Sequence, residues 1–237
     1  MSFVTVKYIR IVFNNLRLKE FDIPKFRGYL AQRYAHFNLI HNHLTKGRLR
    51  YAYPAIQFKV LDGFPAIIAI GLGIDVLKQV FMDINEIDVD GKTYQINEKS
   101  IVIDKVTVGQ AADRHNYNFL LPWMGLNQTN HTAYQTLTFN ERPVFLEKIL
   151  RGNLKSLAKG FDYFIPDFEN VQMQAELKPV TRNFKNNRML CFEGCFSTNF
   201  LIPDYLGLGK QTARGFGTVV RVKNHEDRDK EVGLTTK

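Results

Sequence analysis

The segment between residues 36 and 50 gathers three of the six histidines of the chain with three cations. These residues are His36, His41, His43, Lys46, Arg48 and Arg50. Histidine titrates near neutral pH and is the usual general acid or base. A neighbouring cluster of cations would hold a phosphate and stabilise the charge that develops when it is attacked. His41 and His43 are therefore candidates for acid–base chemistry on a phosphate ester.

Two other interpretations of this histidine pair stay open. His-x-His on a strand puts both imidazoles on one face, as zinc hydrolases use them. However, no Asp, Glu or Cys occurs between Asp22 and Asp62 to complete a metal site, and the clustered cations would repel a divalent ion. The histidines could also be loop residues without a chemical role.

A glycine-rich stretch near the C-terminus is the second feature that suggests chemistry. Its glycines alternate with polar residues: Gly207, Gly209, Lys210, Thr212, Arg214, Gly215 and Gly217. Glycine reaches positive φ at low cost and lets another backbone approach closely. The stretch therefore predicts a loop that offers bare N–H groups and two cations to an anionic ligand such as phosphate. A hairpin loop with a basic tip is the alternative.

The glycine spacing does not match the common nucleotide-binding loops. Asp204 stands where the Walker pattern needs a glycine, and Gln211 stands where it needs Ser or Thr. The β-branched segment 216–222 follows the loop and predicts a strand. Because the loop leads into a strand and not into a helix, a polyanion backbone lying over it is favoured over a phosphate at a helix N-terminus.

The net charge of +9 is unevenly distributed. Between Lys7 and Lys59 there are eleven Lys or Arg against Glu20 and Asp22, whereas residues 61–112 hold four Lys against eight acids. Basic surface concentrated in the first quarter and repeated around the glycine stretch is typical of a polyanion-binding protein. No apolar run of membrane length and no signal peptide occur, which favours a cytoplasmic protein without a membrane partner.

Elements with distinct periodicities must position these residues. In the first half we expect the order β-α-β-β-α-β of the ferredoxin-like pattern, in which the turns Asp62-Gly63 and Asp90-Gly91 each join two strands. The expected elements are a strand at 3–13, a helix from about 22 to 36, strands at 54–61 and 64–71, a helix at 73–84, and a strand pair at 87–96 and 100–108.

The second half predicts a reduced copy of the same topology. We expect a strand at 115–121, a helix at 141–161, strands at 168–180 and 188–201, and a last strand. The fold class is thus α+β with tandem ferredoxin-like domains over 1–110 and 111–224, followed by a charged tail, 225–237. Cys191 and Cys195 lie in the strand at 188–201, where an apolar role is favoured over a disulfide or metal pair. Trp123 and Asn127 could stack on and hydrogen-bond unpaired bases, although packing of Trp123 at a domain interface is an alternative.

Five segments together resemble one known family. They are Phe26-Arg-Gly-Tyr29, Leu39-Ile-His-Asn-His43, Tyr53-Pro-Ala-Ile-Gln-Phe-Lys-Val60, Leu121-Pro-Trp-Met-Gly-Leu-Asn127 and the stretch from Phe200 to Gly217. They resemble the CRISPR-associated endoribonucleases of the Cas six family, RNA-binding proteins of the RAMP superfamily that process precursor crRNA, in a form like that of Bacteroidetes. The glycine stretch is shared by other RAMP proteins.

The resemblance implies an endoribonuclease that cuts CRISPR repeat RNA without a metal or other cofactor. In such enzymes the 2′-hydroxyl attacks the adjacent phosphorus and leaves a 2′,3′-cyclic phosphate and a 5′-hydroxyl. His43 is the matching principal histidine and His41 its partner, with Lys46 and either Tyr29 or Tyr34 assisting. The expected RNA-binding residues are Arg27, Arg33, Arg48, Arg50, Trp123, Asn127, Arg182, Lys185, Arg188, Gly207, Gly209, Lys210, Thr212, Arg214, Gly215 and Gly217.

Two alternative functions remain at this stage. One is a non-catalytic RAMP subunit that binds guide RNA inside a CRISPR effector complex, and the other is a metal-dependent hydrolase that uses His41 and His43. Besides repeat RNA, an effector complex or a second copy of the chain is an expected partner.

Overall fold

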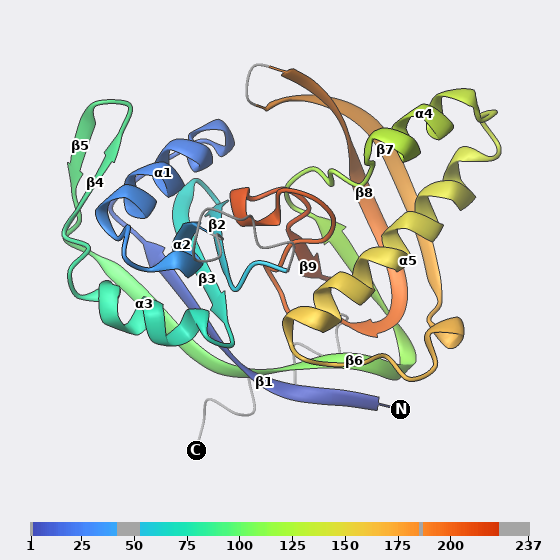
Figure 1. Cartoon of the computed structure of the whole chain (residues 1–237), viewed down its shortest axis with the longest axis horizontal. Coiled ribbons are helices and arrows are strands. Elements are labelled where there is room, and N and C mark those ends of the chain that lie inside the picture. Colours follow the sequence, from blue (N-terminus) through green and yellow to red (C-terminus); the bar gives the residue numbers. More distant parts are fainter. Residues whose placement is uncertain (1, 42–52, 185–186, 223–237) are drawn as a thin grey trace.

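One curled antiparallel sheet runs through the whole molecule (Figure 1). A computed structural model of the chain describes residues 2–41, 53–184 and 187–222. Within them the strand order is β2-β3-β1-β6-β8-β7, and β9 pairs with β6. The strands are β1 (Ser2–Phe13), β2 (Ile56–Leu61), β3 (Phe64–Ile70), β6 (Lys99–Phe119), β7 (Met173–Phe184), β8 (Asn187–Leu201) and β9 (Val219–Arg221). The predicted α+β, tandem ferredoxin-like fold class is confirmed.

The first half has the predicted β-α-β-β-α-β order. Helices α1 (Ile23–Arg33) and α3 (Gly73–Phe81) pack on one face of its strands, and the short helix α2 (Asn38–His41) follows α1. In the core beneath α1, the ring of Phe26 meets Phe13 and Phe58 edge-on, with centroids 5.7 and 5.4 Å apart. Asp62 and Gly63 form the β2–β3 turn with φ of 51° and 83°, as a two-residue hairpin requires.

The strand pair predicted at the end of the first half is arranged differently. The Asp90–Gly91 turn joins β4 (Glu86–Val89) to β5 (Lys92–Gln95), which form a separate two-stranded sheet. The predicted strands 100–108 and 115–121 are wrong as two elements, because β6 is one continuous strand. It pairs with β1 as far as Gln110 and with β8 from Gly109 onward, with a register shift between Gln110 and His115. The domain division predicted near residue 110 thus falls inside β6 and stays a prediction, and the tail 225–237 lies outside the described residues.

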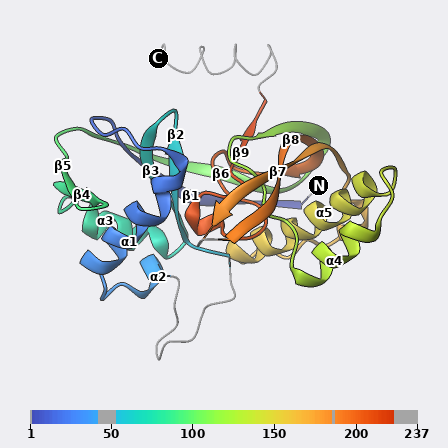
Figure 2. The ribbon, with the colours of Figure 1, turned by 90° about the horizontal axis from the view of Figure 1, so that it is seen from above.

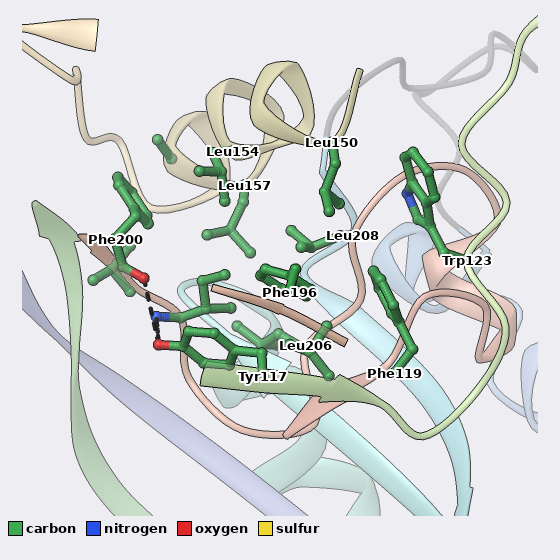
Figure 3. Packing of buried hydrophobic residues seen from close by; sticks show 14 of the residues in the cluster. Tyr117, Phe119, Trp123, Leu150, Leu154, Leu157, Phe196, Phe200, Leu206 and Leu208 are labelled. Atoms are coloured by element: carbon green, nitrogen blue, oxygen red, sulfur yellow. Dashed lines mark hydrogen bonds between the residues drawn. The ribbon is translucent and has the colours of Figure 1, made fainter. Parts of the chain in front are cut away.

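The second half is built on the other end of β6. Helix α5 (Arg142–Gly160) covers the sheet there, and Leu150, Leu154 and Leu157 point from it into the core toward Phe196 (Figure 3). Helix α4 (Gln128–Thr136), which was not predicted, begins after Asn127. The 3-10 turn η2 (Phe168–Asn170) precedes β7, so this strand starts later than predicted.

Both cysteines lie on β8 as free thiols. Cys191 is fully buried, and burial raises the pKa of its thiol to about 11, as suits an apolar role. No helix in the described part of the chain is long and apolar enough to cross a membrane.

Candidate nucleic-acid interface

The glycine-rich loop, residues 207–217, lies between the two halves of the molecule (Figure 1). Three side chains that precede or belong to β2 hold it there. The hydroxyl of Tyr53 donates to the Gly207 carbonyl at 2.9 Å, and the Gly207 N–H donates to Gln57 Oε1 at 3.0 Å. Lys59 Nζ donates to the Thr212 carbonyl at 3.2 Å. The loop belongs to the C-terminal half by sequence, but it is fastened to the N-terminal half.

The loop needs glycine because its backbone is left-handed and closely packed. Gly209, Gly215 and Gly217 have φ of 85°, 93° and 65°. A Cβ added to Gly209 would lie 2.6 Å from the Trp123 Nε1 atom. A Cβ added to Gly217 would lie 2.0 Å from the Leu208 carbonyl oxygen. Substitution is therefore hindered by both conformation and space.

The expectation that this loop offers bare N–H groups is wrong for much of its length. The N–H groups that already have partners are those of Gly207, Leu208, Lys210, Arg214, Gly215 and Gly217. The Leu208 N–H closes the loop by donating to the Gly217 carbonyl. The Gly217 N–H donates to the Pro122 carbonyl, and the Lys210 N–H donates to the Met124 carbonyl. A compact loop must satisfy its own buried donors. The groups of the loop best suited to hold an anion are therefore its cations.

One of these cations lies near a cation of the N-terminal half, at the junction where the loop packs on α1. Arg214 belongs to the 3-10 turn η3 (Thr212–Arg214), and Arg27 belongs to α1. Burial, together with the positive charge of Arg214, lowers the pKa of Arg27 to about 10, and burial also lowers the pKa of Arg214. With a pKa of about 10, Arg27 remains charged at neutral pH. Two half-buried like charges raise the local potential, so a phosphate bound between them would relieve their repulsion.

The β7–β8 hairpin reaches over to this junction from the other side, as both views show (Figures 1 and 2). The Phe184 ring meets Phe216 of the loop edge-on, with ring centroids 5.7 Å apart. The Arg214 guanidinium lies 5.4 Å from the centre of the Phe184 ring. Arg188 is exposed on β8, whereas Arg182 forms an ion pair with Glu193. Lys185 lies outside the described residues. The hairpin thus adds the aromatic side chain of Phe184 to the junction.

Tyr29 and Arg33 belong to a network on the β4 side of α1. Arg33 donates to the Tyr29 hydroxyl at 2.8 Å and pairs with Glu86 at 3.0 Å, and the Tyr29 hydroxyl lies 3.4 Å from the same carboxylate. Tyr34 is buried, and burial raises the pKa of its phenol although the charge of Arg33 opposes this. The structure does not bring these side chains to the glycine-rich loop.

Only residues 36–41 of the histidine segment are described. His41 closes α2, but its side chain and the residues His43, Lys46, Arg48 and Arg50 lie outside the described part. Within the segment, Ile40 is buried in the N-terminal core. After it, Tyr53 is bonded to the glycine-rich loop. The described residues hold no group of three His, Cys, Asp or Glu side chains that could bind a metal ion.

Trp123 is not available for base stacking, so its assignment as an RNA-binding residue is wrong. It is 0% exposed, its Nε1 donates to Asn153 Oδ1 at 2.9 Å, and it packs beneath Gly209. The burial of its neighbours Leu121, Pro122 and Met124 accounts for this, because an apolar run of that kind belongs to a core. Asn127 is exposed and serves as the N-cap of α4, where its side chain accepts from the Asn130 N–H at 2.7 Å.

Sequence reasoning missed the side chains that anchor the loop. Gln57 and Lys59 both occupy one face of the otherwise apolar strand β2, and both are buried. Two polar residues at period two in an apolar strand are the signal that could have found them. Lys59 is fully buried with Thr212 as its partner, and burial lowers its pKa well below the usual range.

We expect Lys59→Met to be more stable than the wild type at pH 7, with an advantage that shrinks toward pH 10. The buried amine is favoured in its neutral form, so the unfolded state binds more protons below the unfolded pKa of about 10.4. Wild-type stability therefore rises with pH in this window, by at most about 1.4 kcal/mol per unit. The Met variant loses the hydrogen bond to the Thr212 carbonyl, which lowers its stability advantage by about 1 kcal/mol. Urea denaturation from pH 7 to 10 tests this, and a pH-independent difference between the two proteins would contradict it.

Comparisons with known proteins cover both halves of the chain. The family model of the Cas6b N-terminal domain matches residues 4–107, and that of the Cas6b C-terminal domain matches residues 109–222. A crystal structure of Cas6b is 38% identical, with a TM-score of 0.88 over 92% of this chain and 100% of that one. A crystal structure of the CRISPR RNA processing endoribonuclease Cas6b is 34% identical, with a TM-score of 0.75 over the same shares. An uncharacterized protein of Methanocaldococcus jannaschii is 32% identical over 145 residues, which are 61% of this chain and 98% of that protein.

Proposed function

The chain belongs to the Cas6b family, and from this premise we propose that it is an endoribonuclease that cuts CRISPR repeat RNA within precursor crRNA. The observation that carries the proposal is the junction between the halves. There Arg27 and Arg214 come together beside the glycine-rich loop. Tyr53, at the end of the histidine segment, is bonded to the same loop. Cations beside a phosphodiester stabilise the charge that develops when the ester is cleaved.

The proposed reaction is an attack by the ribose 2′-hydroxyl on the neighbouring phosphorus, without a metal. His43 is the principal histidine, and His41 is its partner. One of the two removes the 2′-hydroxyl proton as the general base, and the other delivers a proton to the departing 5′ oxygen as the general acid. The O–P bond that forms closes a 2′,3′-cyclic phosphate, and the bond that breaks leaves a 5′-hydroxyl. Lys46 would stabilise the negative charge that develops on the phosphorane oxygens.

Tyr29 and Tyr34 are assigned no step in this mechanism. Tyr29 is engaged by Arg33 and Glu86, and the raised pKa of Tyr34 keeps its phenol protonated at neutral pH. Neither therefore supplies a base near the glycine-rich loop, and the proton transfers rest on the histidines.

The test is incubation of the purified chain, in excess EDTA, with labelled repeat RNA from its own genome and with copies that carry a 2′-deoxy sugar at each candidate position. We expect one cut with a cyclic-phosphate end, and one deoxy substitution that blocks it. Tight binding without a cut would instead support a non-catalytic subunit of an effector complex. Loss of cleavage in EDTA that is restored by a divalent ion would support a metal-dependent hydrolase.

We expect the double variant Lys210→Gln/Arg214→Gln to bind repeat RNA more weakly and with a flatter salt dependence. Lys210 is exposed at the tip of the loop, and Arg214 lies half-buried beside Arg27. Two lost phosphate contacts on a single strand reduce the slope of log K against log[salt] by about 1.4. Binding isotherms between 50 and 300 mM salt, roughly the range in which such slopes are resolved, measure this.

The matched control is Lys78→Gln/Lys92→Gln, which removes the same charge from α3 and β5. These two lysines are exposed. The control is expected to keep the wild-type slope, because it changes the net charge without touching the junction. An unchanged slope in the loop variant would remove the glycine-rich loop from the RNA-binding surface.

A further inference from the structure

The solvent-facing side of α5 carries a line of cations that the proposed cleavage site does not use. Lys148, Lys155 and Lys159 are exposed and are spaced i, i+7 and i+11, so they lie on one side of the helix. This side is opposite to the leucines that point into the core (Figure 3). The rise of the helix places the first and last of them about 16 Å apart along its axis. We refer to these three lysines as the α5 stripe.

A pocket opens beside the C-terminal end of the α5 stripe. It has a volume of about 260 Å³, and its lining includes Lys155, Lys159, Phe164, Phe168 and Glu169. The Phe164 side chain is 83% exposed, although burying a ring of this size would be favourable. Lys155 Nζ lies 3.9 Å from the centre of the Phe168 ring. Cations and aromatic rings therefore alternate along one surface.

Two acidic side chains lie beside the α5 stripe or its pocket. Glu147 is turned toward β7, where its carboxylate accepts from the Ala175 N–H at 2.9 Å. Glu169 lines the pocket, where a carboxylate can accept a hydrogen bond from the exocyclic amine of a base. Lysines for phosphates, an exposed ring for stacking and one acceptor for a base edge are the groups that bind single-stranded nucleic acid.

The α5 stripe ends close to Tyr53, one of the side chains that hold the glycine-rich loop. Lys159 precedes Gly160, where a Cβ would lie 2.6 Å from Tyr53 Cδ1. Tyr53 follows the histidine segment in the chain and is bonded to Gly207. A polynucleotide that leaves the glycine-rich loop past Tyr53 therefore meets the end of α5 next.

We propose that the α5 stripe and its pocket form a second RNA-binding site, which holds the single-stranded RNA that flanks the cleaved repeat. The lysines contact successive phosphates, and Phe164 stacks on a base. The inference rests on the proposed function, because it takes the flanking RNA of that substrate as the ligand.

The experiment compares two RNAs that carry the blocking 2′-deoxy sugar, so that binding is measured without cleavage. One is the repeat alone, and the other is the repeat extended by about ten single-stranded nucleotides at each end. The variant is Lys148→Gln/Lys155→Gln/Lys159→Gln. The control, Lys78→Gln/Lys92→Gln/Lys105→Gln, removes equal charge from exposed positions of the other half. Thermal melting verifies that both variants are folded.

On the extended RNA, the salt slope of the stripe variant is expected to fall by about two units, while the control keeps the wild-type slope. On the repeat alone, the stripe variant is expected to match the wild type. Phe164→Ala is expected to weaken binding of the extended RNA roughly tenfold without changing the slope, because stacking carries no charge.

Two results would overturn the inference alone. One is a wild-type slope for the stripe variant on the extended RNA. The other is an equal fall of the salt slope on both RNAs, which would mean that the α5 stripe binds the repeat itself. If the wild type cuts the unmodified repeat in either case, the proposed function stands. A wild type that neither binds nor cuts the repeat refutes the proposed function and the inference with it.

Discussion

Replacing His41 and His43 together by alanine is expected to abolish cleavage of repeat RNA while leaving its binding within a few-fold of the wild type. General acid–base catalysis by one positioned side chain contributes about 10²–10⁴-fold to the rate. Loss of both proton-transfer groups should therefore lower single-turnover cleavage by at least about 10³-fold. Binding should persist because we propose that it depends on the cations of the junction, including Arg27 and Arg214.

The single variants and one matched histidine sharpen this test. His43→Ala is expected to lower the cleavage rate more than His41→Ala does, because His43 is proposed as the principal histidine. His131→Ala removes a histidine from α4 in the other half of the chain and is expected to cut at the wild-type rate. Parallel loss of binding and cleavage in the double variant would argue that the histidines hold the RNA and do not transfer protons. Retained cleavage would remove them from the chemistry.

Gly217→Ala is expected to destabilise the folded protein by roughly 3–5 kcal/mol. Gly217 has φ of 65°, and an added Cβ would lie 2.0 Å from the Leu208 carbonyl oxygen, which is backbone and cannot rotate away. To relieve this clash, the loop would have to break the hydrogen bond from the Leu208 N–H to the Gly217 carbonyl, which is 2.9 Å long. For a chain of this size, such a loss lowers the melting temperature by about 10 °C.

Gly152→Ala is the matched control for this substitution. Gly152 lies on the exposed side of α5, and a Cβ there would meet nothing within 4 Å. The same change of side chain is therefore expected to stabilise the protein by about 0.5–1 kcal/mol, because alanine favours the helix. Urea denaturation of both variants gives the two free energies of unfolding. If Gly217→Ala stayed within about 1 kcal/mol of the wild type, the loop would be more adaptable than its packing implies.

Local patterns were enough to predict most of the elements. Alternation gave β1, helical spacing gave α1, α3 and α5, and the Asp62-Gly63 dipeptide gave the β2–β3 turn. Each of these signals is read from neighbouring residues, and the structure confirms them to within a few positions. Strand β6 was predicted as two strands because its continuity depends on pairing with β1 and then with β8, which no local pattern reports.

For the site, the amino-acid sequence specifies which chemical groups are present, and the fold places some of them together. The glycines of the loop, the histidine pair and the excess of cations are local facts, since composition and spacing carry them. Only tertiary structure brought Arg27 beside Arg214, buried Lys59 against Thr212 and enclosed Trp123. These outcomes depend on contacts between segments far apart in the chain, where burial and the partners of each polar group are settled together.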